Sequence, residues 1–124
     1  MKLNLKITAL LGAITVILGA FGAHALKETL SEAALKSFET GVRYQMYHVI
    51  VLLFVNGYTG FSNRVKNGIS YFLFAGIACF SGSIYAISFG VPASSIWFLT
   101  PLGGLFLIAG WSFMFISFMK SSKN

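Results

Sequence analysis

Charged residues are scarce in this chain of 124 residues, and aspartate is absent altogether. Only 10% of the residues are charged, whereas an average soluble domain carries about 25%. The acidic residues, Glu28, Glu32 and Glu39, all lie in one short segment. So few charges cannot keep a chain with 56% hydrophobic residues dissolved in water. The composition therefore excludes an ordinary soluble domain and predicts that lipid surrounds most of the surface.

Cysteine is nearly absent too, because Cys79 is the only one. A single cysteine excludes an internal disulfide bond and a zinc site built from cysteines. The long apolar stretches contain no acidic or basic residue, which argues against hydrolysis and against transport coupled to a membrane-embedded carboxylate. Lysine and arginine do not cluster on a soluble face, as a nucleic-acid-binding module would require. We therefore expect no enzymatic activity, no nucleic-acid partner, no cofactor and no metal ion.

Four uncharged stretches are long enough to span a bilayer, namely residues 7–23, 44–60, 69–90 and 101–119. A membrane-spanning helix needs about 17–25 residues. None of the stretches alternates with the two-residue period of a membrane barrel, so helices are the remaining structure. The sequence predicts an all-α fold, with residues 1–124 forming a single membrane domain. We expect the four spans to pack as a four-helix bundle.

Basic residues flank these stretches unevenly. On one side of the predicted membrane, where no acidic residue lies, they are Lys2, Lys6, Arg64, Lys66, Lys120 and Lys123. The positive-inside rule places this side, with both termini, in the cytoplasm. We therefore expect a multi-pass protein of the plasma (inner) membrane whose main partner is the lipid bilayer. A cleaved signal peptide is the alternative for the N-terminus, because Ala23-His24-Ala25 resembles a cleavage site.

The segment between the first two stretches predicts a short amphipathic helix over about residues 30–40. Thr29 and Glu32 have the spacing of a capping box, in which Thr29 begins the helix. Apolar residues recur at four-residue spacing from Leu30 to Phe38 and form one stripe. We expect this helix to rest on the membrane surface or on the ends of the spans.

Polar side chains gather at the start of the second stretch. Gln45, His48 and Asn56 share one face of a helix with about 3.6 residues per turn. Polar groups within a span usually face other helices, so we expect hydrogen bonds between helices. A ligand site is the alternative. The candidate polar cluster also contains residues expected near the outer membrane surface, namely His24, Arg43, Tyr44 and Tyr47.

His24 ends the first stretch and His48 begins the second, so the connecting segment should return the chain to the same depth. Two histidines on neighbouring helices could hold a haem iron or another metal ion. Structural histidines at the interface explain the same pattern, and we assign no metal to them. Arg43 with its neighbouring tyrosines is typical of an interfacial anchor. The same residues could also bind a lipid phosphate or an anionic ligand.

Small residues recur at four-residue spacing in two of the stretches, which permits close packing of helices. They are Gly19 and Ala23 in the first stretch and Ala78, Gly82, Ala86 and Gly90 in the third. Packing within the bundle is the interpretation that we favour. Other membrane proteins, or a second copy of the chain, could use such a stripe instead.

Four motifs together resemble a known family. They are GAFGAH at residues 19–24, TGVRYQMYH at 40–48, FSGSIY at 80–85 and TPLGG at 100–104. In this order they resemble the small bacterial membrane family called domain of unknown function 423, which is similar to eukaryotic transmembrane protein 256. The resemblance implies a four-span protein of the bacterial inner membrane. It implies no activity, because that family is uncharacterised.

Two hypotheses for the function follow. The first is a non-enzymatic structural, accessory or assembly component of the membrane, which the small extramembrane portion and the lack of catalytic groups favour. The second is a small transporter or a lipid- or ligand-binding protein. It would use the polar cluster at the outer end of the first two spans.

Overall fold

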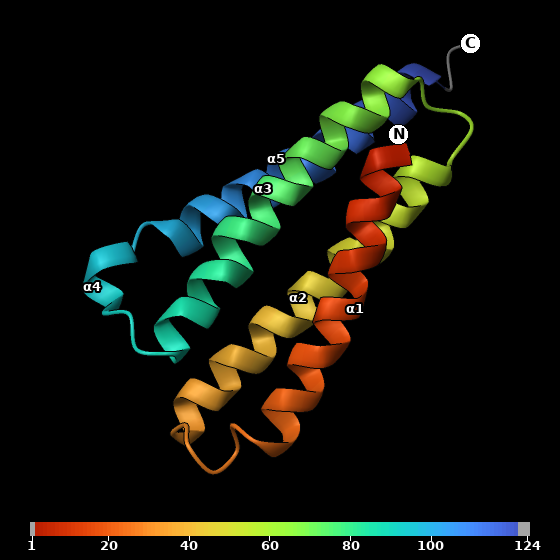
Figure 1. Ribbon diagram of the computed structural model, residues 1–124. Helices are drawn as coiled ribbons and strands as arrows, with labels where there is room; N and C mark the ends of the chain where they lie inside the picture. Colours follow the sequence, from red (N-terminus) through yellow and green to blue (C-terminus); the bar gives the residue numbers. More distant parts are fainter. Residues whose placement is uncertain (1, 122–124) are drawn as a thin grey trace.

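The computed structural model describes residues 2–121, which form helices joined by short connections (Figure 1). The helices are α1 (Lys2–His24), α2 (Glu32–Gly57), α3 (Asn63–Ser88), α4 (Ala93–Ile96) and α5 (Leu99–Ser121). No strand occurs in the described part of the chain. The predicted all-α fold is therefore confirmed.

Three helical segments are long and apolar enough to cross a membrane: α1, α3, and the segment Ala93–Ser121 that contains α4 and α5. At 26 residues, α2 is as long as α3. It is not one of the three, because charged residues occupy its first half and Gln45, His48 and Asn56 lower the hydropathy of its second half. Length and composition alone thus support three crossings.

The separate surface helix predicted over about residues 30–40 does not exist. α2 runs without interruption from Glu32 to Gly57, so the amphipathic segment forms its first turns. The apolar stripe contacts the end of another helix of the chain through Phe38. Phe38 is completely buried, and its ring centroid lies 5.2 Å from that of Tyr85 and 6.0 Å from that of Phe89. The prediction of a separate helix is wrong, whereas the contact of Phe38 with the end of α3 agrees with the alternative that the stripe rests on the ends of the spans.

Ser31, and not Thr29, begins α2. The Ser31 hydroxyl oxygen accepts a hydrogen bond of 3.1 Å from the backbone N–H of Ala34. Such a cap satisfies one of the N–H groups that have no partner within the helix. The Thr29 hydroxyl instead donates to the carbonyl oxygen of Leu26 at 3.4 Å. The predicted capping box is therefore wrong by two residues.

The long helices pack in chain order, with α1 on α2, α2 on α3, and α3 on α5 (Figure 1). Both ends of the described chain lie at one end of the molecule, and α4 lies toward the other (Figure 1). The pair α1–α2 and the pair α3–α5 lie close together near the termini and diverge toward α4 (Figure 1). α1 and α5 share no extended contact. The arrangement is therefore more open than the predicted four-helix bundle, in which the first and last helices would also pack.

Glycines bring α3 and α5 together around the main apolar core. A Cβ atom added at Gly103 would overlap the backbone of Phe80, and one added at Gly110 would lie 2.7 Å from Leu73 Cδ2. Small residues at such contacts let helix backbones approach closely in membranes. The core beside this contact consists of Leu52, Val55, Phe61, Ile69, Leu73, Ile77, Leu107 and Met114.

The small residues predicted to pack the helices are not the glycines that bring α3 and α5 together. On α1, Gly19 contacts α2, since a Cβ atom there would lie 3.6 Å from Val42 Cγ1, whereas Ala23 is exposed. In the third predicted stretch, a Cβ atom added at Gly82 or at Gly90 would meet no atom within 4 Å. Ala78 is exposed and Ala86 is half-buried, and Gly90 lies beyond the end of α3. Among the described residues, no other helix therefore packs closely on Gly82.

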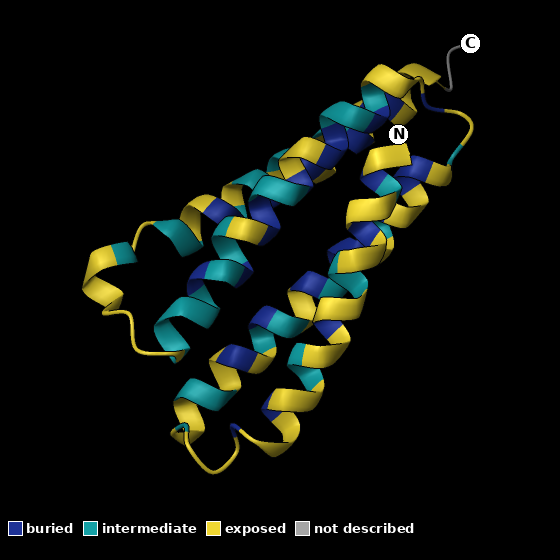
Figure 2. Cartoon of the chain, viewed as in Figure 1, coloured by how far each residue is buried: buried dark blue, intermediate teal, exposed yellow. Residues whose placement is uncertain are grey.

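The surface of the long helices is largely apolar. Exposed residues line their outer faces along their whole length (Figure 2). Large apolar side chains that are at least 62% exposed include Leu3, Leu10, Val16, Ile17, Leu105, Ile108 and Phe115. Soluble monomeric proteins rarely expose such extensive apolar surfaces to water. Contact with lipid explains this surface.

Candidate functional site

Gln45 joins three helices from a buried position on α2, where it is 2% exposed. Its Nε2 donates to the carbonyl oxygen of Leu11 on α1 at 3.3 Å. Its Oε1 accepts a hydrogen bond of 2.7 Å from the hydroxyl of Tyr85 on α3. Both ends of the amide thus have partners, which avoids the cost of about 1–3 kcal/mol for a buried polar group without one. The geometry gives Gln45 the role of holding α1 and α3 against α2.

His48 links α2 to α5 through Nε2 of its ring, while Nδ1 bonds to a carbonyl of α2 itself. Nε2 lies 3.0 Å from Nε1 of Trp111, and Nδ1 lies 2.6 Å from the carbonyl oxygen of Tyr44. An indole N–H can only donate, so Nε2 of His48 accepts and Nδ1 carries the proton. The imidazole is therefore neutral, and both of its nitrogens are occupied by protein partners. This arrangement leaves no ring nitrogen of His48 for a metal ion.

His24 lies far from His48, contrary to the prediction that the two share one depth. Near the end of α1, a Cβ atom added at Gly22 would lie 2.9 Å from the Phe38 ring. Phe38 precedes His48 by ten residues, which correspond to about 15 Å along a helix. The prediction is wrong because α2 begins at Glu32 and not near residue 44, so the chain turns back earlier.

A two-histidine site for haem or another metal is therefore not formed. Within residues 2–121, no three or more His, Cys, Asp or Glu side chains are grouped so that they could hold a metal ion. His24 itself is exposed at the end of α1.

Asn56 belongs to a second polar group, near the other end of α2. Its Nδ2 donates to Ser70 Oγ and to the carbonyl oxygen of Leu52, both at 2.9 Å. Its Oδ1 accepts a hydrogen bond of 3.1 Å from Nδ2 of Asn4, which also donates to Oδ1 of Asn67 at 2.8 Å. These bonds connect α1, α2 and α3. Asn56 is therefore separate from the group around Gln45 and His48.

Hydroxyl groups add further bonds between helices. Ser81 Oγ on α3 donates to the carbonyl oxygen of Gly41 on α2 at 2.7 Å, and the hydroxyls of Ser83 and Thr100 join α3 to α5. In the described helices and connections, every buried side-chain nitrogen or oxygen atom has a hydrogen-bond partner. The polar interior is thus satisfied by the protein alone.

Arg43, Tyr44 and Tyr47 are exposed on α2, and of these Tyr44 also contacts His48, with 6.4 Å between the two ring centroids. Nη2 of Arg43 donates to Thr40 Oγ1 at 3.3 Å, and the rings of Tyr44 and Tyr47 are 5.7 Å apart. Arg43 borders a groove of about 170 Å³ between α1 and α2. The other groove residues are Gly19, Gly22, Ala23, Phe38, Glu39 and Val42. The predicted polar cluster is thus divided between the interior, the outer surface of α2 and the exposed end of α1.

The sequence pattern does not identify five partners in these networks: Asn4, Asn67, Ser70, Tyr85 and Trp111. The two asparagines fall just outside the uncharged stretches 7–23 and 69–90. Tyr85 and Trp111 lie inside the apolar stretches 69–90 and 101–119. Both carry a polar atom that needs a partner when the ring is within a membrane, and this signal could have identified them.

The helical fold, the apolar outer surface and the internally bonded polar side chains define a helical membrane protein. Residues 18–104 match the sequence model of a family described as "Protein of unknown function (DUF423)". The chain belongs to this family, as its motifs predicted.

Relatives of similar length support this assignment. The chain is 38% identical to the UPF0382 membrane protein SH2409 of Staphylococcus haemolyticus, over 97% of this chain and 98% of the relative. It is 33% identical to the UPF0382 inner membrane protein YgdD of Escherichia coli strain K12, over 99% of this chain and 94% of the relative. No solved structure matches the chain significantly.

Proposed function

We propose that this protein is a non-enzymatic structural, accessory or assembly component of the plasma (inner) membrane, which it crosses four times. The spans are α1, α2, α3 and α5, and both termini lie in the cytoplasm. One observation carries the proposed role: the polar side chains of the interior are bonded to one another across the helices. Under this proposal, the outer surface is the part of the molecule that contacts lipid and other proteins.

A catalytic or substrate-binding site needs polar groups that are free to contact a ligand. Within the described residues, the buried polar side-chain atoms all have partners in the protein. Gln45 and Asn56 each connect three helices, and His48 connects two. Hydrogen bonds of this kind contribute to helix association in membranes. This use of the polar residues supports an architectural role over a chemical one.

The proposal of four crossings rests on how α2 lies beside α1. The two helices are in contact from Asn4 and Asn56 near one end to Gly22 and Phe38 near the other. If α1 crosses the membrane, α2 therefore occupies the same depth. Its polar residues Gln45, His48 and Asn56 are at most 5% exposed, so they avoid lipid. An even number of crossings keeps both termini on one side, and the basic residues there favour the cytoplasm.

A lateral face of α3 supports association with another membrane protein or a second copy of the chain. Ala78 is exposed, and a Cβ atom added at Gly82 would have no atom within 4 Å. Ala86 continues this face at the same spacing. Small residues that are not used within a chain allow another transmembrane helix to approach closely.

Gly82→Leu tests the proposal with a matched control, Gly104→Leu on α5. Neither glycine has a neighbour that a new Cβ atom would meet, so both variants should fold. Tagged proteins would be extracted from membranes in a mild detergent, and the mass and composition of each complex measured. We expect a stoichiometric protein partner or a second copy with the wild type and Gly104→Leu, but not with Gly82→Leu. Monomers without a protein partner in all three preparations would contradict the proposal.

The groove beside Arg43 favours a second candidate function, that of a lipid- or ligand-binding protein or a small transporter. It opens between α1 and α2, with the opposite charges of Glu39 and Arg43 at its border. Under this alternative, a small molecule or lipid co-purifies with the wild type and is lost in Arg43→Gln. Lys27→Gln, an exposed charge change outside the groove, is the control. Equal small-molecule content in all three proteins would argue against this candidate.

A further inference from the structure

The end of the molecule that holds both ends of the described chain has basic residues without acidic ones. Among residues 2–121, the basic residues of this end lie at the start of α1, at the start of α3 and at the end of α5. They are Lys2, Lys6, Arg64, Lys66 and Lys120. The acidic residues Glu28, Glu32 and Glu39 lie around the connection between α1 and α2, at the opposite end (Figure 1). This positive end faces the headgroup region of whichever leaflet surrounds it.

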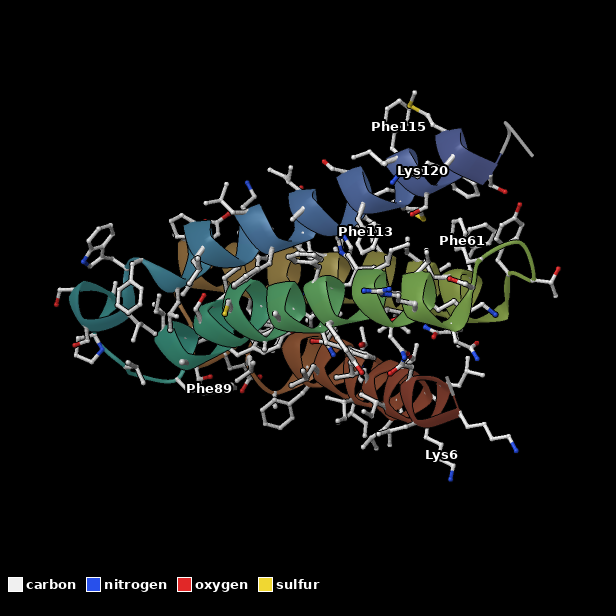
Figure 3. All side chains as sticks on the ribbon, turned by 90° about the horizontal axis from the view of Figure 1, so that it is seen from above. Lys6, Phe61, Phe89, Phe113, Phe115 and Lys120 are labelled. Carbon is white, nitrogen blue, oxygen red and sulfur yellow. The ribbon has the colours of Figure 1, made fainter. Side chains whose placement is uncertain are left out.

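A cavity of about 300 Å³ opens at this positive end, between the α2–α3 connection and the last turns of α5. Its polar lining consists of Lys120, Ser62, Ser117 and Ser121, and its apolar walls include Phe61 and Phe113. Figure 3 shows Phe61, Phe113 and Lys120 at the same end of the molecule. Lys120 is exposed, so its ammonium group is accessible to a ligand in the cavity. The cavity therefore combines one cation and several hydroxyls with an apolar wall.

These groups match the chemistry of a phosphodiester anion. An ammonium group and serine hydroxyls can all donate hydrogen bonds to phosphate oxygens, and bonds to a charged acceptor are the stronger kind. Ser62 Oγ accepts a hydrogen bond of 3.3 Å from the Val65 N–H, which leaves its own hydroxyl proton available for donation. No acidic residue lines the cavity, so nothing there would bind the ammonium group of a zwitterionic lipid.

The position of the cavity favours a lipid over a free phosphate ion. Lys120 follows a long uncharged run in α5, so its ammonium group lies where the hydrocarbon region ends. Ile116, which is 48% exposed, and Phe113 extend the cavity wall along α5 toward the apolar surface. A volume of about 300 Å³ admits a headgroup, and the acyl chains would lie outside along this wall.

We propose that this cavity binds the phosphate headgroup of an anionic phospholipid. Lys120 supplies the positive charge, and the hydroxyls of Ser117 and Ser121 supply hydrogen bonds. The inference requires only that the helices lie in a membrane, so it holds for either function proposed above.

Lys120→Gln tests the site, with Lys6→Gln as the matched control. Lys6 carries the same charge at the same end but does not line the cavity, and Figure 3 shows it projecting from the far side of α1. Both lysines are exposed, so neither change disturbs the packing. Each purified protein would be mixed in detergent with equal amounts of phosphatidylglycerol and phosphatidylcholine of the same acyl chains. Native mass spectrometry then measures the ratio of the two bound lipids, with and without excess glycerol phosphate.

We expect the wild type to retain phosphatidylglycerol in preference to phosphatidylcholine. Lys120→Gln should lower this preference about tenfold, because it removes a hydrogen bond to a charged group. Lys6→Gln should leave it unchanged, because Lys6 does not line the cavity. Equal binding of the two lipids by the wild type would overturn the proposal. So would an equal loss in both variants, or displacement of the lipid by free glycerol phosphate.

Discussion

Replacing Tyr85 by Phe removes one hydroxyl group from the interior and leaves the ring in place. The ring would keep its contact with Phe38, whose centroid lies 5.2 Å away. Oε1 of Gln45 would lose the hydroxyl that donates to it at 2.7 Å, while Nε2 would keep its bond to Leu11. Since Gln45 is 2% exposed, no water can easily replace the lost donor.

Two ranges bound the free energy of unfolding that Tyr85→Phe is expected to remove. An unsatisfied buried acceptor costs about 1–3 kcal/mol in soluble proteins. Hydrogen bonds between membrane helices contribute about 0.6 kcal/mol on average and about 1.7 kcal/mol at most. We therefore expect Tyr85→Phe to lower the free energy of unfolding by about 1 kcal/mol. In a Gln45→Leu background the same change should cost almost nothing, because the acceptor has already gone.

A double-mutant cycle on Gln45 and Tyr85 measures this coupling. The free energy of unfolding of the four proteins would be determined by titration with sodium dodecyl sulfate in mixed micelles, followed by far-ultraviolet circular dichroism. Tyr71→Phe is the control, since it removes the hydroxyl of a tyrosine on the same helix that is 62% exposed. Additive effects, with no coupling beyond about 0.3 kcal/mol, would refute the assigned bond.

Two further predictions concern the start of α2 and the orientation of the protein in the membrane. Ser31→Ala should destabilise the first turn of α2 by about 1 kcal/mol and raise amide hydrogen exchange there, whereas Thr29→Ala should not. Equal exchange in both variants would contradict the assigned cap. Single cysteines at Glu32 and Ser121, in a Cys79→Ala background, should react differently with an impermeant reagent in intact cells. We expect labelling at position 32 only, and labelling at position 121 only would reverse the proposed orientation.

The apolar stretches located α1, α3 and α5 because an uncharged run of this length must be helical in lipid. They did not locate the start of α2. The charged segment that begins at Glu32 has the same helical period as the apolar run after it, and nothing between them stops the helix. Gly41, which could have ended it, packs instead against α3, where a Cβ atom would lie 3.1 Å from the Tyr85 ring. That contact depends on tertiary packing, which a pattern along the chain does not contain.

The inward direction of Gln45, His48 and Asn56 could be predicted, because they share one helical face. Their partners could not, since Tyr85 and Trp111 come from helices 40 and 63 residues away along the chain. Which residues meet depends on how far each helix is shifted along its neighbour. The glycine contacts between helices set this shift, and spacing within a single stretch does not reveal it.

His48→Leu tests most directly whether the polar interior holds the helices together or serves a ligand. The change keeps an apolar side chain between α2 and α5 but removes the partners of Trp111 Nε1 and the Tyr44 carbonyl oxygen. One preparation, analysed by native mass spectrometry over a temperature ramp, reports both the unfolding midpoint and the bound components. We predict a lower midpoint than in the wild type and the same bound components. An unchanged midpoint together with the loss of a bound component would contradict the architectural role.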